Sequence, residues 1–278
     1  MLIRIVVALL LLPIVPLVLY VAPAWVLPVA LSLAGALSAG ELLVNTKKIP
    51  KKRLTAYAVV FAAAIPLWVY AGDTIPEPLG GALPVAGFAV FLLLLFAEAV
   101  ADFGRVNFTQ IALMLTSALA LPYCLSSLVR IAALPGGKHY ILLPFIAALL
   151  GDTFAYFVGV SFGKRKLTPV SPKKTVEGSV GGVLGVLAGM AAYGLIQQFA
   201  VGNPVSFPLL LLYGLIGSAA GQLGDLSMSV IKREFGVKDF GSLLPGHGGV
   251  LDRLDSLIFA APAVEVLILL LPAIQVAA

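Results

Sequence analysis

The chain is a succession of long apolar stretches separated by short polar segments. A helix needs roughly 20 apolar residues to cross a bilayer, and most of these stretches reach that length. They lack the ten-residue alternation of membrane β-strands, so helices are favoured over a barrel. The pattern predicts an all-α, polytopic integral membrane protein. We expect nine spans, at about residues 3 to 22, 24 to 44, 54 to 71, 80 to 101, 108 to 133, 140 to 162, 179 to 200, 206 to 231 and 256 to 276.

The basic residues predict the orientation of these spans, because cytoplasmic loops retain Lys and Arg. Arg4 precedes the first apolar stretch as in a signal peptide, but no clear small-x-small cleavage site follows, so we interpret this span as retained. With nine spans and a cytoplasmic N-terminus, 16 of the 18 basic residues fall on the cytoplasmic side, and only Arg130 and Lys138 fall opposite. We therefore expect a multi-pass protein of the cell's inner membrane whose polar loops face the cytoplasm.

Composition narrows the class of partner. The chain is 60% hydrophobic and 11% charged, with a net charge of +5. Its basic residues are spread among loops instead of forming a stripe on a soluble domain, which argues against nucleic acid and for the membrane surface. For the basic loop 47–53, membrane topology and attraction to anionic lipid headgroups both remain open. The single cysteine, Cys124, lies within a span, so cysteine provides neither a disulfide nor a zinc site.

A dense polar run, residues 229–255, stands between two predicted spans and suits metal and phosphate better than lipid. Asp225 lies 27 residues before Asp252, and the intervening loop can fold back to bring the two carboxylates together at the membrane surface. Carboxylate oxygens with room for water and substrate phosphates suit Mg²⁺, which usually takes only one or two protein carboxylates. The run therefore predicts a magnesium site.

The Gly-rich turn 245–249 in this run can direct backbone N–H groups towards an anion, although a tight loop between helices explains it equally well. His247 is flanked by Lys238, Asp252 and Arg253, so we expect it to orient a phosphate or a metal-bound water. A second candidate is the loop before the seventh predicted span. There Ser171, Lys173, Lys174 and Thr175 combine two ammonium groups, two hydroxyls and a helix start, which favours phosphate. Whether that phosphate belongs to a nucleotide or a lipid stays open, and a purely topological basic loop is the alternative.

Acidic residues in or near the apolar stretches also need an explanation, because a carboxylate in a span costs about 3 kcal/mol on insertion scales. Asp152 and Asp225 can be functional or can pair with nearby lysines. For Glu98 and Asp102 the two interpretations are evenly balanced, and we expect Glu265 to be a pairing or lipid-interface residue.

The polar segments resemble one known family. Residues 229–255 match Ser-x-apolar-Lys-Arg, then Lys-Asp-x-Gly, then Leu-Pro-Gly-His-Gly-Gly-x-x-Asp-Arg-x-Asp, which is similar to the motif of the phosphatidate cytidylyltransferases (CDP-diacylglycerol synthases). Residues 151–156, 162–167 and 171–178 resemble further segments of that family. The departures are Phe154, where Gly is common, and Val176, where an aromatic is common; they affect packing more than chemistry.

The resemblance implies a metal-dependent transferase that moves CMP from CTP to phosphatidic acid, a membrane lipid, on the cytoplasmic face. Asp225 and Asp252 would hold Mg²⁺, and Asp255 would be an outer ligand or serve a second metal ion. A homodimer is expected. The remaining site residues implied are Lys232, Arg233, His247 and Arg253 for catalysis, and Ser171, Lys173, Lys174, Thr175, Lys238, Gly248, Gly249 and Asp152 for substrate or phosphate.

We expect residues 1–106 to form a scaffold, lipid gate or dimer surface, and residues 107–278 to form the catalytic region. Two other functions remain as alternatives. A CTP-dependent lipid kinase would transfer the γ-phosphoryl group, and an ion-coupled transporter would use Asp152 and Asp225 to bind a cation in the membrane.

Overall fold

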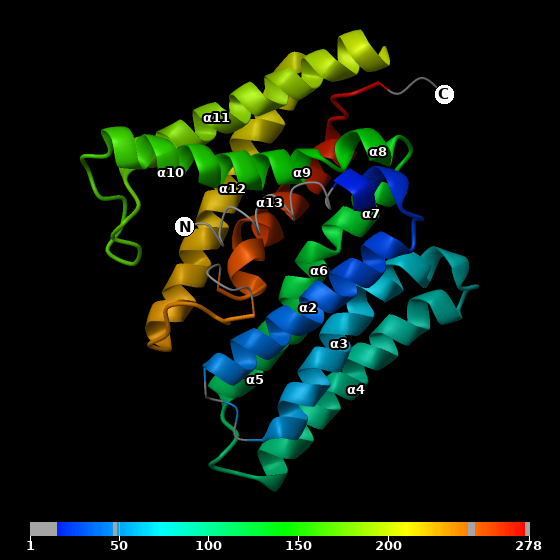
Figure 1. Ribbon diagram of the computed structural model, residues 1–278. Coiled ribbons are helices and arrows are strands. Elements are labelled where there is room, and N and C mark those ends of the chain that lie inside the picture. Colours follow the sequence, from blue (N-terminus) through cyan, green and yellow to red (C-terminus); the bar gives the residue numbers. More distant parts are fainter. Residues whose placement is uncertain (1–15, 47–48, 50, 244–247, 276–278) are drawn as a thin grey trace. The chain divides into compact units, whose positions relative to one another are not determined.

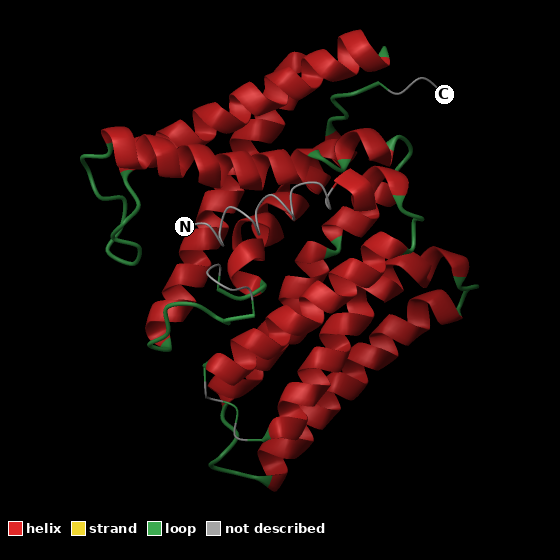
Figure 2. Cartoon of the chain, viewed as in Figure 1, coloured by secondary structure: helices red, strands yellow, loops and turns green. Residues whose placement is uncertain are grey.

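The computed structural model describes residues 16–46, 49, 51–243 and 248–275. Every named element in those ranges is helical, as Figures 1 and 2 show, which confirms the all-α prediction. Within these described ranges, seven helices are long and apolar enough to cross a membrane, so the chain is a multi-pass membrane protein. Their bounds are Val26–Asn45, Lys52–Ala71, Leu79–Ala101, Phe108–Ala133, Gly137–Phe162, Val176–Val201 and Phe207–Glu234.

The two remaining predicted spans lie at the ends of the chain. Most of the first one falls on residues 1–15, outside the described residues, and Leu17–Val21 form a π-helical turn. The last one corresponds to α13 (Leu251–Leu270), which is not among the seven and carries Asp252, Arg253, Asp255 and Glu265. The count of nine spans and the cytoplasmic N-terminus stay predictions.

The chain forms two compact units. Unit 1 comprises Met1–Val129 and Phe235–Arg253, and unit 2 comprises Arg130–Glu234 and Leu254–Ala278. The polar run is therefore divided between them. The division predicted from the sequence, into residues 1–106 and a catalytic region at residues 107–278, is one of function. It stays a prediction.

Unit 1 is built on α2 (Val26–Asn45) and α3 (Lys52–Ala71), which pack along each other, with α4 (Leu79–Ala101) against α3. α5 (Phe108–Leu115) begins at a capping box, in which Asn107 and Gln110 bond each other's backbone N–H groups at 3.1 and 2.9 Å. In α4 only Phe91, Leu95 and Glu98 are buried, and they form one stripe at helical spacing. Most of the other apolar side chains of α4 are exposed, as lipid contact requires.

Unit 2 contains α10 (Gly151–Phe162), α11 (Val176–Leu195), α12 (Phe207–Glu234) and most of α13. Glycines let α11 approach α10 closely. A Cβ on Gly182 would lie 2.8 Å from the Gly151 carbonyl oxygen, and one on Gly185 would lie 2.6 Å from Phe154 Cβ. The glycine spacing of α11 therefore serves packing within the chain. The predicted homodimer stays a prediction.

Candidate functional site

The basic loop between α10 and α11 has a defined conformation. Thr175, which is buried, caps α11 by accepting a hydrogen bond from the Gly178 N–H at 3.1 Å. The Val176 N–H donates to the Arg165 carbonyl at 2.9 Å, and the Leu167 N–H donates to the Lys174 carbonyl at 3.0 Å. These bonds join the two ends of the loop and fix the backbone at Lys174.

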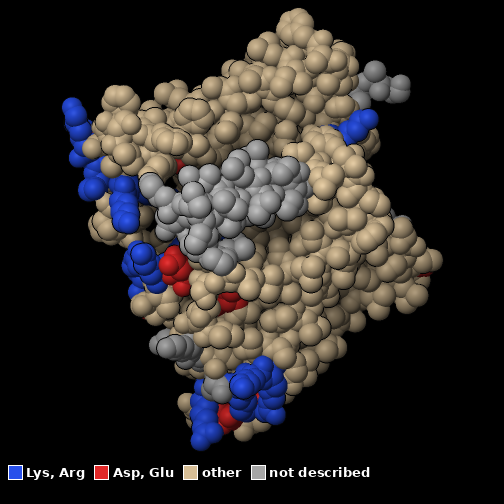
Figure 3. Space-filling model, in the orientation of Figure 1, with Lys and Arg blue, Asp and Glu red and all other residues tan. Residues whose placement is uncertain are grey.

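Glu177 holds the other side of this loop. Its carboxylate accepts hydrogen bonds from the Lys164 and Arg165 N–H groups, at 3.0 and 3.2 Å. The same residue lies in the first turn of α11, where the helix dipole favours negative charge. Figure 3 shows Lys and Arg side chains gathered at this loop, beyond the end of α10. The loop therefore presents its cations from an ordered backbone.

Lys174 joins the loop to α12. Its ammonium group forms an ion pair with the carboxylate of Asp225, and both side chains are partly buried. Lys173 is exposed beside it, and the Ser171 carbonyl accepts the Lys174 N–H at 3.0 Å. The structure therefore brings together the loop cation and the α12 acid that the sequence singled out separately.

Two more acids belong to the same unit. Asp255 is buried in the second turn of α13, and Asp152 and Asp225 are near enough to interact electrostatically with its carboxylate. Lys232 Nζ lies 3.9 Å from Asp255 Oδ2. The Ser256 hydroxyl donates to Asp152 Oδ2 at 3.0 Å. Three predicted site carboxylates and two lysines thus gather in unit 2.

These residues suit a metal ion held by one or two protein carboxylates better than a metal ion enclosed by protein ligands alone. Among the residues that the structure describes, no set of three or more His, Cys, Asp or Glu is arranged to enclose a metal ion. Mg²⁺ commonly takes one or two carboxylates and completes its shell with water and substrate phosphates. Asp225 and Asp255 offer hard oxygen ligands of this kind, so the donor chemistry fits Mg²⁺.

Asp252 organises the polar run within unit 1. Its Oδ2 atom accepts the Phe240 N–H at 2.8 Å and the Gly249 N–H at 3.0 Å. Gly248 has a φ of 84°, which L residues rarely adopt, so glycine is required there. Lys238 and Arg253 are exposed in the same unit. The amide of Gly249 is thus already engaged by the Asp252 carboxylate.

The other predictions made for the polar run stay predictions. His247 lies outside the described residues. The approach of Asp252 to Asp225 stays a prediction, as do the roles assigned to Arg233 and Arg253. Arg233 lies on the last turn of α12, where its Nε donates to the Val170 carbonyl at 3.4 Å.

Sequence reasoning missed two residues of α2 that contact the polar run. Glu41 accepts hydrogen bonds from the Val250 and Leu251 N–H groups, at 2.9 Å each. The side chain of Asn45 donates to the Phe240 carbonyl. A signal was available, because Glu41 is a carboxylate near the C-terminal end of an apolar span and carries the same insertion cost as Asp152.

Other acids have structural partners. Glu98 pairs with Lys51 at 3.0 Å and with Arg53 at 2.6 Å, and Asp102 pairs with Lys51 at 2.8 Å. The hydrogen bond that Lys51 donates to Asp102 is the main cause that raises the pKa of Lys51, and the same bond lowers the pKa of Asp102. The pairing interpretation of Glu98 and Asp102 is therefore confirmed, and two cations of the loop 47–53 are used within the protein.

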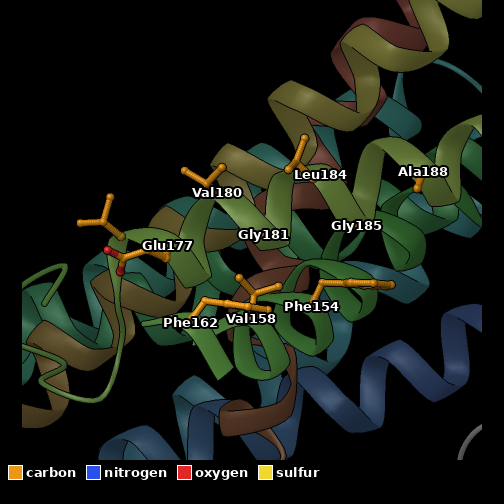
Figure 4. Close-up of a pocket in the computed structure, with 10 residues that line it drawn as sticks. Phe154, Val158, Phe162, Glu177, Val180, Gly181, Leu184, Gly185 and Ala188 are labelled. Atoms are coloured by element: carbon orange, nitrogen blue, oxygen red, sulfur yellow. The ribbon is translucent and has the colours of Figure 1, made fainter. Parts of the chain in front are cut away.

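An apolar groove runs between α10 and α11 (Figure 4). It has a volume of about 540 Å³. Phe154, Val158 and Phe162 form one wall, and Val180 and Leu184 stand on the other. Glu177 lies at the end of the groove nearest the basic loop. The apolar groove thus extends along two helices towards the basic loop.

These features define a class: a helical multi-pass membrane protein with a polar site built from a basic loop and the ends of its helices. The comparison with known proteins specifies it further. The chain belongs to the cytidylyltransferase family, whose sequence pattern matches residues 2–271.

Curated relatives carry a common name. The chain is 40% identical to the phosphatidate cytidylyltransferase of Bacillus subtilis over 182 residues, which cover 65% of each protein. It is 48% identical over 134 residues to the protein of that name from Staphylococcus saprophyticus, covering 48% of this chain and 50% of the relative. For the Staphylococcus aureus protein the identity is 47% over the same length and coverage. The matches thus span between half and two thirds of the relatives' own length.

Proposed function

We propose that this protein transfers the cytidylyl group of CTP to phosphatidate, forming CDP-diacylglycerol and pyrophosphate. The observation that carries the proposal is the Lys174–Asp225 ion pair, which holds the basic loop against α12 in a chain of the cytidylyltransferase family. The names of the relatives supply the substrate pair. We place the reaction at the cytoplasmic face of the inner membrane, because that orientation gathers the basic loops on the side where CTP is available.

The proposed chemistry is an in-line displacement at phosphorus. An oxygen of the phosphatidate phosphate forms a bond to the α-phosphorus of CTP, while the bond from that phosphorus to the bridging oxygen breaks and pyrophosphate leaves with the electron pair. The attacking phosphate is largely ionised at neutral pH, so no strong general base is needed. Positioning and charge neutralisation must therefore supply most of the rate enhancement.

The residues divide between these two tasks. Lys173 and Lys174, with Ser171 and Thr175, would bind phosphate oxygens at the ordered loop. Lys174 and Asp225 neutralise each other in the described structure, so a triphosphate that attracts Lys174 frees the Asp225 carboxylate for a metal ion. Mg²⁺, when bound, would offset the negative charge that develops on the leaving pyrophosphate.

The lipid substrate suits the groove between α10 and α11. Acyl chains that remain in the bilayer can lie along Phe154, Val158 and Phe162, which are all apolar. Their headgroup then reaches the end of the groove where the basic loop begins. This arrangement allows one substrate to arrive from the membrane and the other from water.

Labelled CTP tests the proposal. Purified protein in mild detergent is given phosphatidate, Mg²⁺ and CTP labelled at either the α- or the γ-phosphate. We expect the α-label in lipid and release of pyrophosphate. The γ-label in lipid with release of CDP would instead identify a lipid kinase. Folded protein that transfers neither label would contradict both, and cation-driven substrate uptake into vesicles would then identify a transporter.

A further inference from the structure

The Glu41 carboxylate lies at an unfavourable end of its own helix. It lies one turn before Asn45, the last residue of α2, towards the end of the helix at which the dipole disfavours negative charge. Its two oxygens instead meet the start of α13, where unpaired N–H groups favour an anion. Glu41 Oε1 accepts the Val250 N–H and Oε2 accepts the Leu251 N–H, both at 2.9 Å. One side chain thus provides a partner for two successive backbone donors of another segment.

Two glycines of the polar run leave the space that Glu41 occupies. A Cβ on Gly249 would lie 2.6 Å from Glu41 Cδ, and a Cβ on Gly241 would lie at the same distance from that atom. No side chain larger than hydrogen fits either position while the Glu41 carboxylate stays in place. The requirement for glycine at 241 and 249 therefore follows from contact with α2 as well as from any contact with phosphate.

Asn45 binds the same loop one helical turn later. It shares a face of α2 with Glu41, since residues four apart lie one above the other. Its side-chain amide donates to the Phe240 carbonyl, while the Phe240 N–H donates to Asp252 Oδ2 at 2.8 Å. Phe240 is fully buried, so both of its backbone groups are paired away from water. Asp252 is therefore oriented by a loop that α2 holds at two points.

We infer that Glu41 is a positioning residue for Asp252. It touches none of the groups proposed to react; it fixes the backbone of residues 249–251, and that backbone fixes the carboxylate. The inference rests on the proposed cytidylyl transfer for its consequence in catalysis. It also gives a role to α2, in which the sequence shows no motif.

The sharpest variant is Glu41→Gln, which keeps the shape but replaces one acceptor oxygen with an NH₂ group that would oppose a backbone donor. We expect hydrogen exchange at Val250 and Leu251 to become about tenfold faster, since a lost hydrogen bond lowers local protection. We expect kcat to fall about tenfold or more with little change in the KM for phosphatidate, and half-maximal activity to need more Mg²⁺. Glu41→Asp retains both oxygens and should recover part of the exchange protection and of the rate. Glu77→Gln, which removes a carboxylate elsewhere in unit 1, should match the wild type.

Each result of these experiments tests a different part of the inference. Unchanged exchange at residues 250 and 251 in folded Glu41→Gln protein would overturn the anchoring role. Faster exchange with unchanged kinetics would overturn the positioning role, because Asp252 would then not depend on the loop. Wild-type protein without cytidylyl transfer would instead overturn the proposed function and, with it, the catalytic consequence of Glu41. The exchange measurement would still test the anchoring by itself.

Discussion

Arg130 and Glu265, 135 residues apart in the chain, form a two-bond ion pair within unit 2. Arg130 Nε lies 2.6 Å from Glu265 Oε1, and Arg130 Nη2 lies 2.8 Å from Oε2. Glu265 is buried in α13, where an unpaired carboxylate would be costly. The pairing interpretation of Glu265 is therefore confirmed, and the pair joins the α7 segment (Ser127–Ala133) to α13.

Breaking this pair should destabilise the protein. Glu265→Gln leaves a guanidinium without its carboxylate, and we expect a loss of the order of 3 kcal/mol in the free energy of unfolding. Chemical unfolding in detergent, followed by circular dichroism, measures it. The double variant Arg130→Met with Glu265→Met should recover most of the loss, because apolar side chains replace both charges. Equal stability of Glu265→Gln and wild type would show that the pair contributes nothing.

Asp225→Asn should nearly abolish cytidylyl transfer while leaving membrane insertion intact. The substitution removes both the partner of Lys174 and the proposed metal ligand. A loss of about 4 kcal/mol of charge stabilisation would lower kcat by about 10³-fold. Glu234→Gln, which changes an exposed carboxylate on the same helix, serves as the control. Equal rates for wild type and Asp225→Asn would remove Asp225 from the site.

Lys174→Gln should weaken CTP binding more than Lys166→Gln does. Both substitutions remove one cation from the same loop, but Lys174 is the one that forms an ion pair with Asp225 of α12 in the described structure. A charge-assisted hydrogen bond contributes about 1.5–3 kcal/mol, so we expect the KM for CTP to rise at least about tenfold. Steady-state kinetics at saturating phosphatidate measures this. If both variants shift KM equally, the loop acts through its total charge alone.

Thr175→Ala should lower stability without touching a charged group. The variant removes the oxygen that accepts the Gly178 N–H at the start of α11, which costs about 1 kcal/mol. The melting temperature in detergent should fall, whereas Thr175→Ser, which keeps the hydroxyl, should stay near wild type. A larger loss of activity than of stability would indicate that the hydroxyl also contacts a substrate phosphate.

Removal of divalent cations should stop the reaction. EDTA is expected to abolish transfer of the α-label, and Mg²⁺ is expected to restore it, because Asp225 and Asp255 supply only carboxylate oxygens suited to a hard cation. Exchange of the treated protein into metal-free buffer provides the control for damage by the chelator. Full activity in metal-free buffer would contradict the proposed magnesium requirement.

Local sequence was enough to predict much of the architecture. Long apolar stretches require helices in lipid, since the bilayer offers no partners for backbone hydrogen bonds. The helix start at Thr175 is also a local property, because a hydroxyl capping an N–H three residues ahead depends on neighbours in the chain. The same holds for the gathering of cations into loops, which follows from the cost of placing them in hydrocarbon.

Pairings across the chain were not predictable in the same way. Lys174 meets Asp225 and Arg130 meets Glu265 only after helices have packed, and several other cations offered equal charge at similar spacing. Glu41 illustrates the point most clearly, because its partners are backbone amides more than 200 residues away. A backbone N–H has no sequence signature, so no motif could have revealed that contact.

The sequence by itself determined an all-helical membrane protein, the segments that carry its polar chemistry and the family to which those segments are similar. It could do so because hydropathy, capping and motif spacing are local properties of the chain. Only the tertiary structure decided which acid faces which base, why Gly241 and Gly249 must be small, and which helix supports the loop of Asp252. Those relationships depend on the approach of distant segments to within a few ångströms, which packing sets and composition does not.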